Sequence, residues 1–182
     1  MKATGIVRRI DDLGRVVIPK EIRRTMRIRE GDPLEIYTDR EGEVIFKKYS
    51  PIGELNAFAA QYAETLHRTA ELPVAVCDKD AVIACAGISR KDFLEKNVSE
   101  QMEEVMEGRT IRLATPEEDF PLTRDAKGDC RVSVVMPIIA EGDVIGAVAS
   151  VTSPDRPIPL SREVETKLIQ TAAGFLGKQL EN

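Results

Sequence analysis

The sequence contains few of the residues on which enzymes and metalloproteins depend. In 182 residues it has one histidine, and it shows no Ser/His/Asp arrangement and no cluster with metal-ligand spacing. The three cysteines are odd in number and form no Cys-x-x-Cys motif, which argues against a disulfide framework and against a structural zinc site. We interpret Cys77, Cys85 and Cys130 as small buried side chains. We therefore expect a protein that is not an enzyme and holds no metal.

Long hydrophobic runs are also absent. No apolar stretch approaches the roughly 18 to 20 residues that a membrane-spanning helix needs. The first residues, Met-Lys-Ala-Thr-Gly, lack the hydrophobic block of a signal peptide. The composition, 42% hydrophobic and 31% charged, is that of an ordinary globular chain. We expect a cytoplasmic protein with no membrane partner.

Charge is distributed unevenly along the chain. Residues 2–29 carry nine basic and three acidic side chains, although the formal net charge of the whole protein is −5. Residues 1–50 carry 12 basic and 9 acidic side chains, whereas residues 51–182 carry 14 and 22. A basic segment on an acidic protein is typical of a nucleic-acid-binding surface. The sequence therefore predicts two domains, 1–50 and 51–182, of which only the first binds DNA.

The basic segment predicts a turn, a strand and a short helix. Asp11, Asp12 and Gly14 favour the turn, and Pro19 suits the first position of the helix. On that helix the basic residues at i, i+3, i+4 and i+7 share one face: Lys20, Arg23, Arg24 and Arg27.

A basic helix face by itself is more often simply solvated than bound to a partner. Arg8, Arg9 and Arg15 alter that balance, because they lie on the two strand segments next to the helix. A compact unit would gather these three arginines and the four helix cations into one patch. The sequence therefore favours phosphate binding.

Residues 4–19 read Thr-Gly-Ile-Val-Arg-Arg-Ile-Asp-Asp-Leu-Gly-Arg-Val-Val-Ile-Pro. This motif, within a match over residues 2–49, resembles the AbrB-type swapped-hairpin DNA-binding domain of bacterial transition-state regulators. In that family, arginines of the first strand, the following loop and the short helix line the DNA surface. The resemblance implies that double-stranded DNA is contacted by the matching positions, Arg8, Arg9, Arg15, Arg23 and Arg24. The helix geometry adds Lys20, Arg27 and Lys2, each of which can equally be a flanking solvated charge.

The remainder of this module predicts a small unit that needs a partner. Residues 34–38 and 43–48 are strand-like runs around the hairpin turn 39–42, which gives four strands and one helix in about 50 residues. So small a unit buries too little apolar surface to be stable alone. It also offers more apolar core candidates than one thin layer needs: Ile6, Ile10, Val16, Ile18, Ile22, Ile28, Leu34, Ile36, Ile45 and Phe46. We expect a dimer, and the resemblance implies two interleaved chains that exchange hairpins.

The second domain predicts a sheet flanked by helices. Ser50-Pro51 opens a linker helix at about 52–68, and a hairpin follows at 74–85. Two short helix starts come next, then a second hairpin at 131–152 and a long helix after Ser161. This order, with Val-Met-Pro-Ile-Ile at 135–139 and Gly-Asp-Val-Ile-Gly-Ala-Val at 142–148, resembles a GAF domain. The expected fold class is α+β, a β-barrel-like swapped-hairpin dimer domain followed by a GAF-like α/β sandwich with flanking helices.

A GAF-like fold implies a small-molecule sensor. No aromatic or cysteine pattern specifies a nucleotide, a haem or a bilin, so no cofactor is certain and the ligand stays unidentified. Residues 114–129 are the candidate lid over a ligand cavity, and the alternative is a plain surface loop.

The C-terminal helix predicts assembly beyond the dimer. Small residues at 172–174 and 177 let helices approach closely, and they leave three apolar anchors for a neighbour, Phe175, Leu176 and Leu180. We expect a tetramer joined through these helices, with a dimer as the alternative.

The two modules in this order resemble sporulation regulators of endospore-forming Gram-positive bacteria. The resemblance implies a nucleoid-associated transcription factor that both activates and represses genes of the forespore. An antitoxin is a weaker interpretation, because antitoxins that share the swapped hairpin usually continue into an extended tail. The remaining alternative is a DNA-binding protein whose C-terminal half is only a scaffold or a protein-interaction module.

Overall fold

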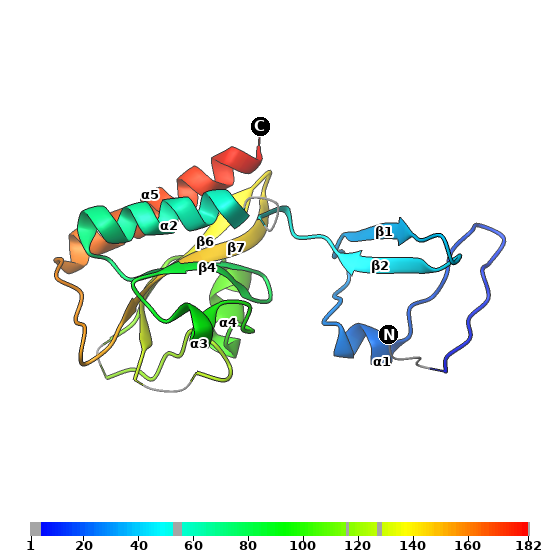
Figure 1. Ribbon diagram of the computed structural model, residues 1–182, viewed down its shortest axis with the longest axis horizontal. Helices are drawn as coiled ribbons and strands as arrows, with labels where there is room; N and C mark the ends of the chain where they lie inside the picture. Colours follow the sequence, from blue (N-terminus) through cyan, green and yellow to red (C-terminus); the bar gives the residue numbers. More distant parts are fainter. Residues whose placement is uncertain (1–4, 53–55, 116, 127–128, 182) are drawn as a thin grey trace. The chain divides into compact units, whose positions relative to one another are not determined.

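The computed structural model describes residues 5–52, 56–115, 117–126 and 129–181. The chain divides into two compact units, Met1–Tyr49 and Ser50–Asn182. Figure 1 labels most of the helices and strands of each unit.

The first unit contains a short helix and a hairpin. Helix α1 (Lys20–Thr25) follows Pro19, and strands β1 (Leu34–Thr38) and β2 (Val44–Lys48) pair in antiparallel fashion. Asp39 shapes the hairpin turn, because its Oδ1 accepts the backbone N–H groups two and four residues further on, at 3.0 and 2.8 Å. The predicted hairpin and the predicted helix are both present.

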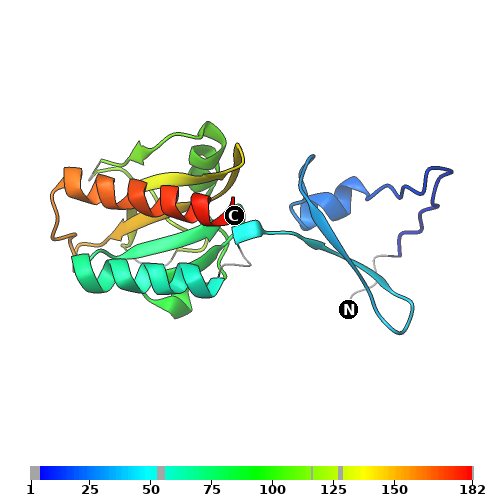
Figure 2. The ribbon, with the colours of Figure 1, turned by 90° about the horizontal axis from the view of Figure 1, so that it is seen from above.

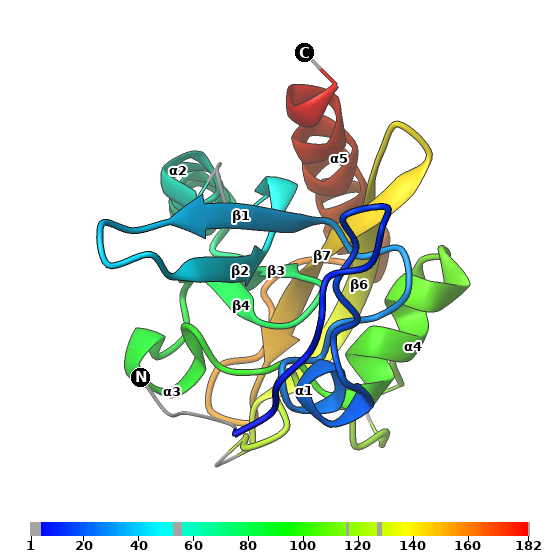
Figure 3. The ribbon, with the colours of Figure 1, turned by 90° about the vertical axis from the view of Figure 1, so that its right-hand side faces the viewer.

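Two further strands predicted for this unit do not form within the chain. Residues 5–10 and 15–19 contain no strand, and Figure 3 shows this dark blue segment before α1 without strand arrows. A strand forms only where a neighbouring strand pairs with its backbone N–H and C=O groups. Among the described residues of this unit, no such neighbour pairs with either segment. The prediction of four strands is therefore wrong for a single chain.

The second unit is a five-stranded antiparallel sheet with helices on both faces. The strand order is β4-β3-β7-β6-β5. Helices α2 and α5 lie side by side over one face, as Figures 1 and 2 show, and α3 and α4 cover the other face. The bounds are α2 Asn56–Ala70, β3 Val74–Asp78, β4 Val82–Ala86, α3 Arg90–Phe93, α4 Glu100–Gly108, β5 Arg112–Leu113, β6 Arg131–Ala140, β7 Asp143–Thr152 and α5 Arg162–Leu180.

Two hydrophobic clusters fill the spaces on either side of this sheet. The cluster under α2 and α5 includes Ile52, Ile138 and Leu176, all fully buried. The cluster under α3 and α4 includes Met102 and Phe120, which are equally inaccessible to solvent. The second unit therefore has a core on each face of its sheet, built entirely from its own residues.

Helix ends differ slightly from the predictions. The linker helix predicted at about 52–68 is described from Asn56 to Ala70, while residues 51 and 52 form a 3₁₀ turn and residues 53–55 lie outside the described chain. Ser161 caps α5 as predicted, because its Oγ accepts the N–H of Val164 at 3.4 Å. None of the described helices is long and apolar enough to cross a membrane.

The apolar stripe of α5 only partly faces the sheet. Ile169, Ala172, Ala173 and Leu176 are buried, whereas Phe175 of the predicted stripe is exposed. The prediction of Leu176 as an anchor for a neighbour is wrong, because Leu176 packs in the core of its own unit. The helix therefore keeps apolar surface that its own sheet does not cover.

Candidate nucleic-acid interface

One carboxylate organises the turn that carries Arg15. Asp11 Oδ1 accepts the backbone N–H groups of Leu13 (3.0 Å) and Arg15 (2.8 Å), and Asp11 Oδ2 accepts Nε of Arg15 at 2.8 Å. Gly14 completes the turn with a φ of 74°, a conformation that suits glycine. The Arg15 backbone N–H, and then its guanidinium, hold the pKa of the Asp11 carboxyl below its ordinary value. The turn therefore fixes the direction of Arg15, although the Arg15 side chain is 69% exposed.

Helix α1 presents Lys20, Arg23 and Arg24 to solvent. The expected continuation of this face to Arg27 is wrong, because α1 ends at Thr25. Arg27 has a φ of 51° and is half-buried, and the next N–H donates back to the carbonyl oxygen of Arg23 at 2.8 Å. This is the closing pattern of a Schellman motif, in which the left-handed position is usually a glycine.

Most of the cations predicted to contact DNA have no partner among the described residues of this unit. The side chains of five predicted DNA contacts make no ion pair and no hydrogen bond with any described residue: Arg8, Arg9, Lys20, Arg23 and Arg24. Arg15 makes one, with Asp11. Lys2 lies outside the described residues. The five unpaired cations can each meet a phosphate oxygen without first giving up a protein partner, and Arg15 uses only Nε for Asp11, which leaves its two Nη groups for a phosphate.

Apolar side chains are exposed next to these cations. Val7 is 86% accessible and Ile10 is 72% accessible, and Leu13, Val16 and Val17 are also exposed. Exposed apolar side chains in such number mark a surface that another molecule covers.

The described residues contain no group of three His, Cys, Asp or Glu side chains that could hold a metal ion. Cys77 and Cys85 are buried as predicted, and Cys130 is half-buried. Burial raises the pKa of the Cys77 thiol far above its ordinary value. A protonated thiol is a poor nucleophile, so Cys77 is a packing residue.

Sequence reasoning missed two features of these units. It assigned Asp11 only a general preference for turns, although Asp11 is the acceptor that orients Arg15. The spacing from Asp11 to Gly14 could have indicated such a side-chain-capped turn. It also missed the Schellman motif that ends α1 at Arg27. This position is usually a glycine, so an arginine there gives no sequence signal for the end of the helix.

A basic N-terminal unit with exposed cations, followed by a helix-flanked sheet, is the domain order of a class of protein, the bacterial transcription factors. The family model described as stage V sporulation protein T C-terminal, transcription factor, matches residues 54–181. A second model, antidote-toxin recognition MazE, bacterial antitoxin, matches residues 7–53. The chain belongs to the stage V sporulation protein T family, which consists of transcription factors and not of enzymes.

Two relatives from Bacillus subtilis (strain 168) illustrate this membership. Stage V sporulation protein T is 54% identical over 181 residues, which span 100% of this chain and 99% of the relative. Transition state regulatory protein AbrB is 65% identical over 51 residues, which span 28% of this chain and 52% of the relative. The N-terminal domain is therefore of the AbrB type, a DNA-recognition domain, as its motif predicted.

The C-terminal domain has a GAF-like fold. It is similar to the GAF domain/HD domain protein from Geobacter sulfurreducens, with a TM-score of 0.50 and 18% identity over 69% of this chain and 91% of that chain. So low an identity shows a shared fold and nothing about ligands. The predicted fold class, an AbrB-like domain followed by a GAF-like domain, is confirmed.

Proposed function

We propose that this protein regulates transcription by binding double-stranded DNA through Arg8, Arg9, Arg15, Arg23 and Arg24. The observation that carries the proposal is that all five are exposed and that four of them, all except Arg15, make no side-chain hydrogen bond or ion pair with a described residue. Lys20 shares the exposed face of α1 and is included. Lys2 is included from the sequence alone. Arg27 is the weakest member, because it is half-buried beyond the end of α1.

Salt dependence tests this proposal directly. Each phosphate contact releases counterions, so affinity for duplex DNA should fall steeply as salt rises. Arg23→Ala or Arg15→Ala should weaken binding about tenfold and reduce the slope of log affinity against log salt by roughly one per protomer. Arg40→Ala is the matched control, because it removes the same charge from the β1–β2 turn. Equal losses in all three variants would contradict the assignment.

The binding unit is a dimer of N-terminal domains that exchange hairpins. Its support is the exposed apolar surface of residues 6–17 and the lack of a strand partner for residues 5–10 and 15–19 among the described residues. A second copy would pair with the backbone of those segments and would at the same time cover exposed apolar side chains such as Val7 or Ile10. The dimer would also double the number of cations on one DNA-binding face.

Two such dimers are joined through their C-terminal helices into a tetramer. The support is an aromatic cluster in which Phe175 of α5 lies 5.8 Å from the ring of Phe58 and 5.4 Å from that of Tyr62, both on α2. Phe175 stays exposed despite these contacts. Light scattering across micromolar concentrations should give four times the mass of one chain, and twice that mass would leave only the dimer.

The protein acts in the cytoplasm of an endospore-forming bacterium, on the nucleoid of the forespore, where it activates some genes and represses others. The support is the full-length likeness to stage V sporulation protein T. A fluorescent fusion should appear in the forespore during sporulation, and deletion should raise some forespore transcripts and lower others. Signal confined to the mother cell would contradict this localisation.

The C-terminal domain senses a small molecule. Its support is a cavity of about 870 Å³ bordered by both ends of the segment 114–129 that the sequence predicts as a lid. The alternative is that the C-terminal domain is only a scaffold or a protein-interaction module, and the exposed apolar surface of α5 supports it. Ligand binding by the full chain decides between them.

A further inference from the structure

The cavity lies at the N-terminal end of α5. Its wall combines residues at the end of β5, the start of β6, the end of β7 and the chain between β7 and α5. Among the described residues, none from α3 or α4 contributes to it. A volume of about 870 Å³ falls within the range of about 300–1,000 Å³ that is typical of small-molecule sites.

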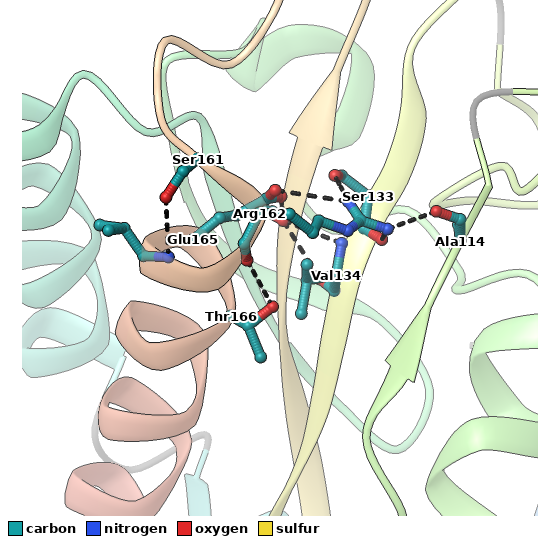
Figure 4. A network of polar contacts seen from close by, with 9 residues as sticks. Ala114, Ser133, Val134, Ser161, Arg162, Glu165 and Thr166 are labelled. Atoms are coloured by element: carbon teal, nitrogen blue, oxygen red, sulfur yellow. Dashed lines mark hydrogen bonds and ion pairs between the residues drawn. The ribbon is translucent and has the colours of Figure 1, made fainter.

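One guanidinium in this wall holds both ends of the adjoining segment. Figure 4 shows Arg162, at the first turn of α5, reaching towards β6 and the end of β5. Its Nη2 donates to the carbonyl oxygens of Ala114 and Ser133, and its Nη1 donates to Ser133 Oγ. Ala114 and Ser133 flank residues 115–132. Arg162 therefore links both ends of that segment to α5, so a displacement of Ala114 or Ser133 would alter its hydrogen bonds.

The carboxylates of the wall are already compensated. Glu165 is 3% exposed, and it accepts from Ser150 Oγ at 2.6 Å and from Arg162 Nη1 at 3.3 Å. Glu118 pairs with Arg112. Asp129 is exposed, so water screens its charge. The wall therefore holds no buried carboxylate that needs a cationic ligand.

One hydrogen-bond donor of Arg162, its Nε–H, is unused by the described residues. Its Nε–H has no hydrogen-bond partner among the described residues, whereas its four Nη hydrogens serve the acceptors named above. Nε and Nη2 lie on the same edge of the guanidinium, and this edge matches the two oxygens of a carboxylate. An anionic ligand can therefore gain one unused donor and compete with Ala114 or Ser133 for the other.

Much of the remaining wall is apolar. Leu113 is 48% exposed although it is a leucine on a strand, and Val132, Pro157, Ile158 and Leu160 continue the apolar surface. A ligand with a hydrocarbon portion would remove this surface from water.

We propose that this cavity binds a carboxylate with an apolar body, held by its carboxylate on the Nε–Nη2 edge of Arg162. The inference rests on the proposed sensing role of the C-terminal domain and names its ligand class. Binding draws an Nη2 donor away from Ala114 or Ser133, and this changes how the segment 115–132 is tied to α5.

The test uses octanoate as the probe and the full chain, with calorimetric titration. Octanol and octylammonium have the same hydrocarbon chain with a neutral or a cationic head, and both should bind at least about tenfold more weakly, because a charge-assisted pair is lost. Equal affinity for octanoate and octanol would overturn the proposal. Absence of octanoate binding would overturn it too.

Two variants locate the site. Arg162→Gln should reduce octanoate affinity at least about tenfold. Should Arg162→Gln fail to fold, Leu113→Asp decides, because it places a carboxylate in the apolar wall at an exposed position and should cause a similar loss. Val164→Asp is the matched control, since Val164 is 47% exposed and lies outside the cavity. Octanoate binding that Leu113→Asp leaves unchanged would place the site elsewhere and contradict the proposal.

DNA titration of the same samples separates this inference from the proposed function. If octanoate fails to bind while duplex DNA binds with the expected salt dependence, the ligand class is wrong and the DNA-binding function stands. If DNA fails to bind while octanoate binds to the Arg162 site, the DNA-binding function is wrong and the ligand class stands.

Discussion

The two units of this chain differ in where their hydrophobic surface goes. All of the buried apolar residues from Ile52 to Leu176 belong to the second unit, where they form a cluster on each face of the sheet. In the described part of the first unit, Pro19 is the one buried residue. The second unit can therefore be stable by itself, whereas the first leaves apolar side chains exposed that its own described residues do not cover.

The units differ in the same way in their charges. In the second unit, arginines pair with nearby carboxylates, as Arg124 does with Glu103 at 2.9 Å and Arg131 with Asp119 at 2.5 Å. In the first unit, Arg8 and Arg23 have no such partner among the described residues. The comparison teaches that one chain can combine a domain that satisfies its own apolar and charged groups with a domain that leaves such groups exposed.

The largest expected effect concerns the self-sufficient unit. Gly146 lies on β7, where an added Cβ would stand 2.1 Å from the carbonyl oxygen of Cys77 on the paired strand β3. Backbone cannot yield as a flexible side chain does, so Gly146→Ala should destabilise the second unit by about 3 kcal/mol or more. Urea denaturation followed by circular dichroism measures the shift.

Gly174→Ala is the control for that prediction. Gly174 lies in α5 with open space around its Cα, and alanine favours a helix, so this variant should stabilise the unit by up to about 1 kcal/mol. Equal midpoints for the two variants would show that the close approach of β7 to β3 does not limit stability.

The next effect tests whether the first unit needs a partner. Ile10→Asp changes an exposed side chain and would be nearly neutral if the first unit worked as a monomer. In a dimer it would bury a charge, so DNA affinity should fall about 100-fold while the second unit melts unchanged. Ile10→Val keeps the apolar surface and should stay within a few-fold of the parent. Fluorescence anisotropy with labelled duplex measures the DNA affinity of both variants. An unchanged affinity for Ile10→Asp would show that no partner covers Ile10.

The same contrast explains how much the sequence could predict. The elements of the second unit followed from local patterns, because their hydrophobic partners lie in the same chain. Only the edge strand β5 was missed there, since two residues are too few to show a period. In the first unit the motif identified the hairpin and helix, but residues 5–10 and 15–19 have no strand partner within the chain, so their pattern predicted more strand than one chain forms.

Residues that break a simple rule were the hardest to foresee. Glu165 is an acidic residue in the first turn of a helix, a position that usually faces solvent, yet Ser150 and Arg162 satisfy its carboxylate in the interior. Arg27 occupies a left-handed position that the sequence would assign to glycine. Both depend on tertiary contacts that no spacing in the sequence reveals.

A smaller effect is expected at the turn that carries Arg15. Gly14→Ala meets no neighbouring atom, but the φ of 74° strains any side chain, at a cost of about 1–2 kcal/mol. Gly42→Ala, in the β1–β2 turn, has a φ of 84° and the same open surroundings. Both variants should lose similar stability, and Gly14→Ala alone should weaken DNA binding about fivefold, because Arg15 loses its fixed direction. Equal DNA affinities would show that the turn does not position a DNA contact.

The smallest effect is a pH dependence confined to the same turn. Hydrogen bonds from the Arg15 backbone and guanidinium and from the Leu13 N–H lower the pKa of Asp11 below 3.8, so they stabilise the turn above that value. This contribution should disappear as pH falls through the lowered pKa, because a protonated carboxyl loses its attraction for these donors. In Arg15→Ala the pKa should rise towards 3.8 without reaching it, since the backbone donors remain, while Arg15→Lys should stay closer to the parent. Carboxyl chemical shifts measured by nuclear magnetic resonance provide the titration, and a midpoint at or above 3.8 in the unaltered protein would show that Asp11 does not hold Arg15 in solution.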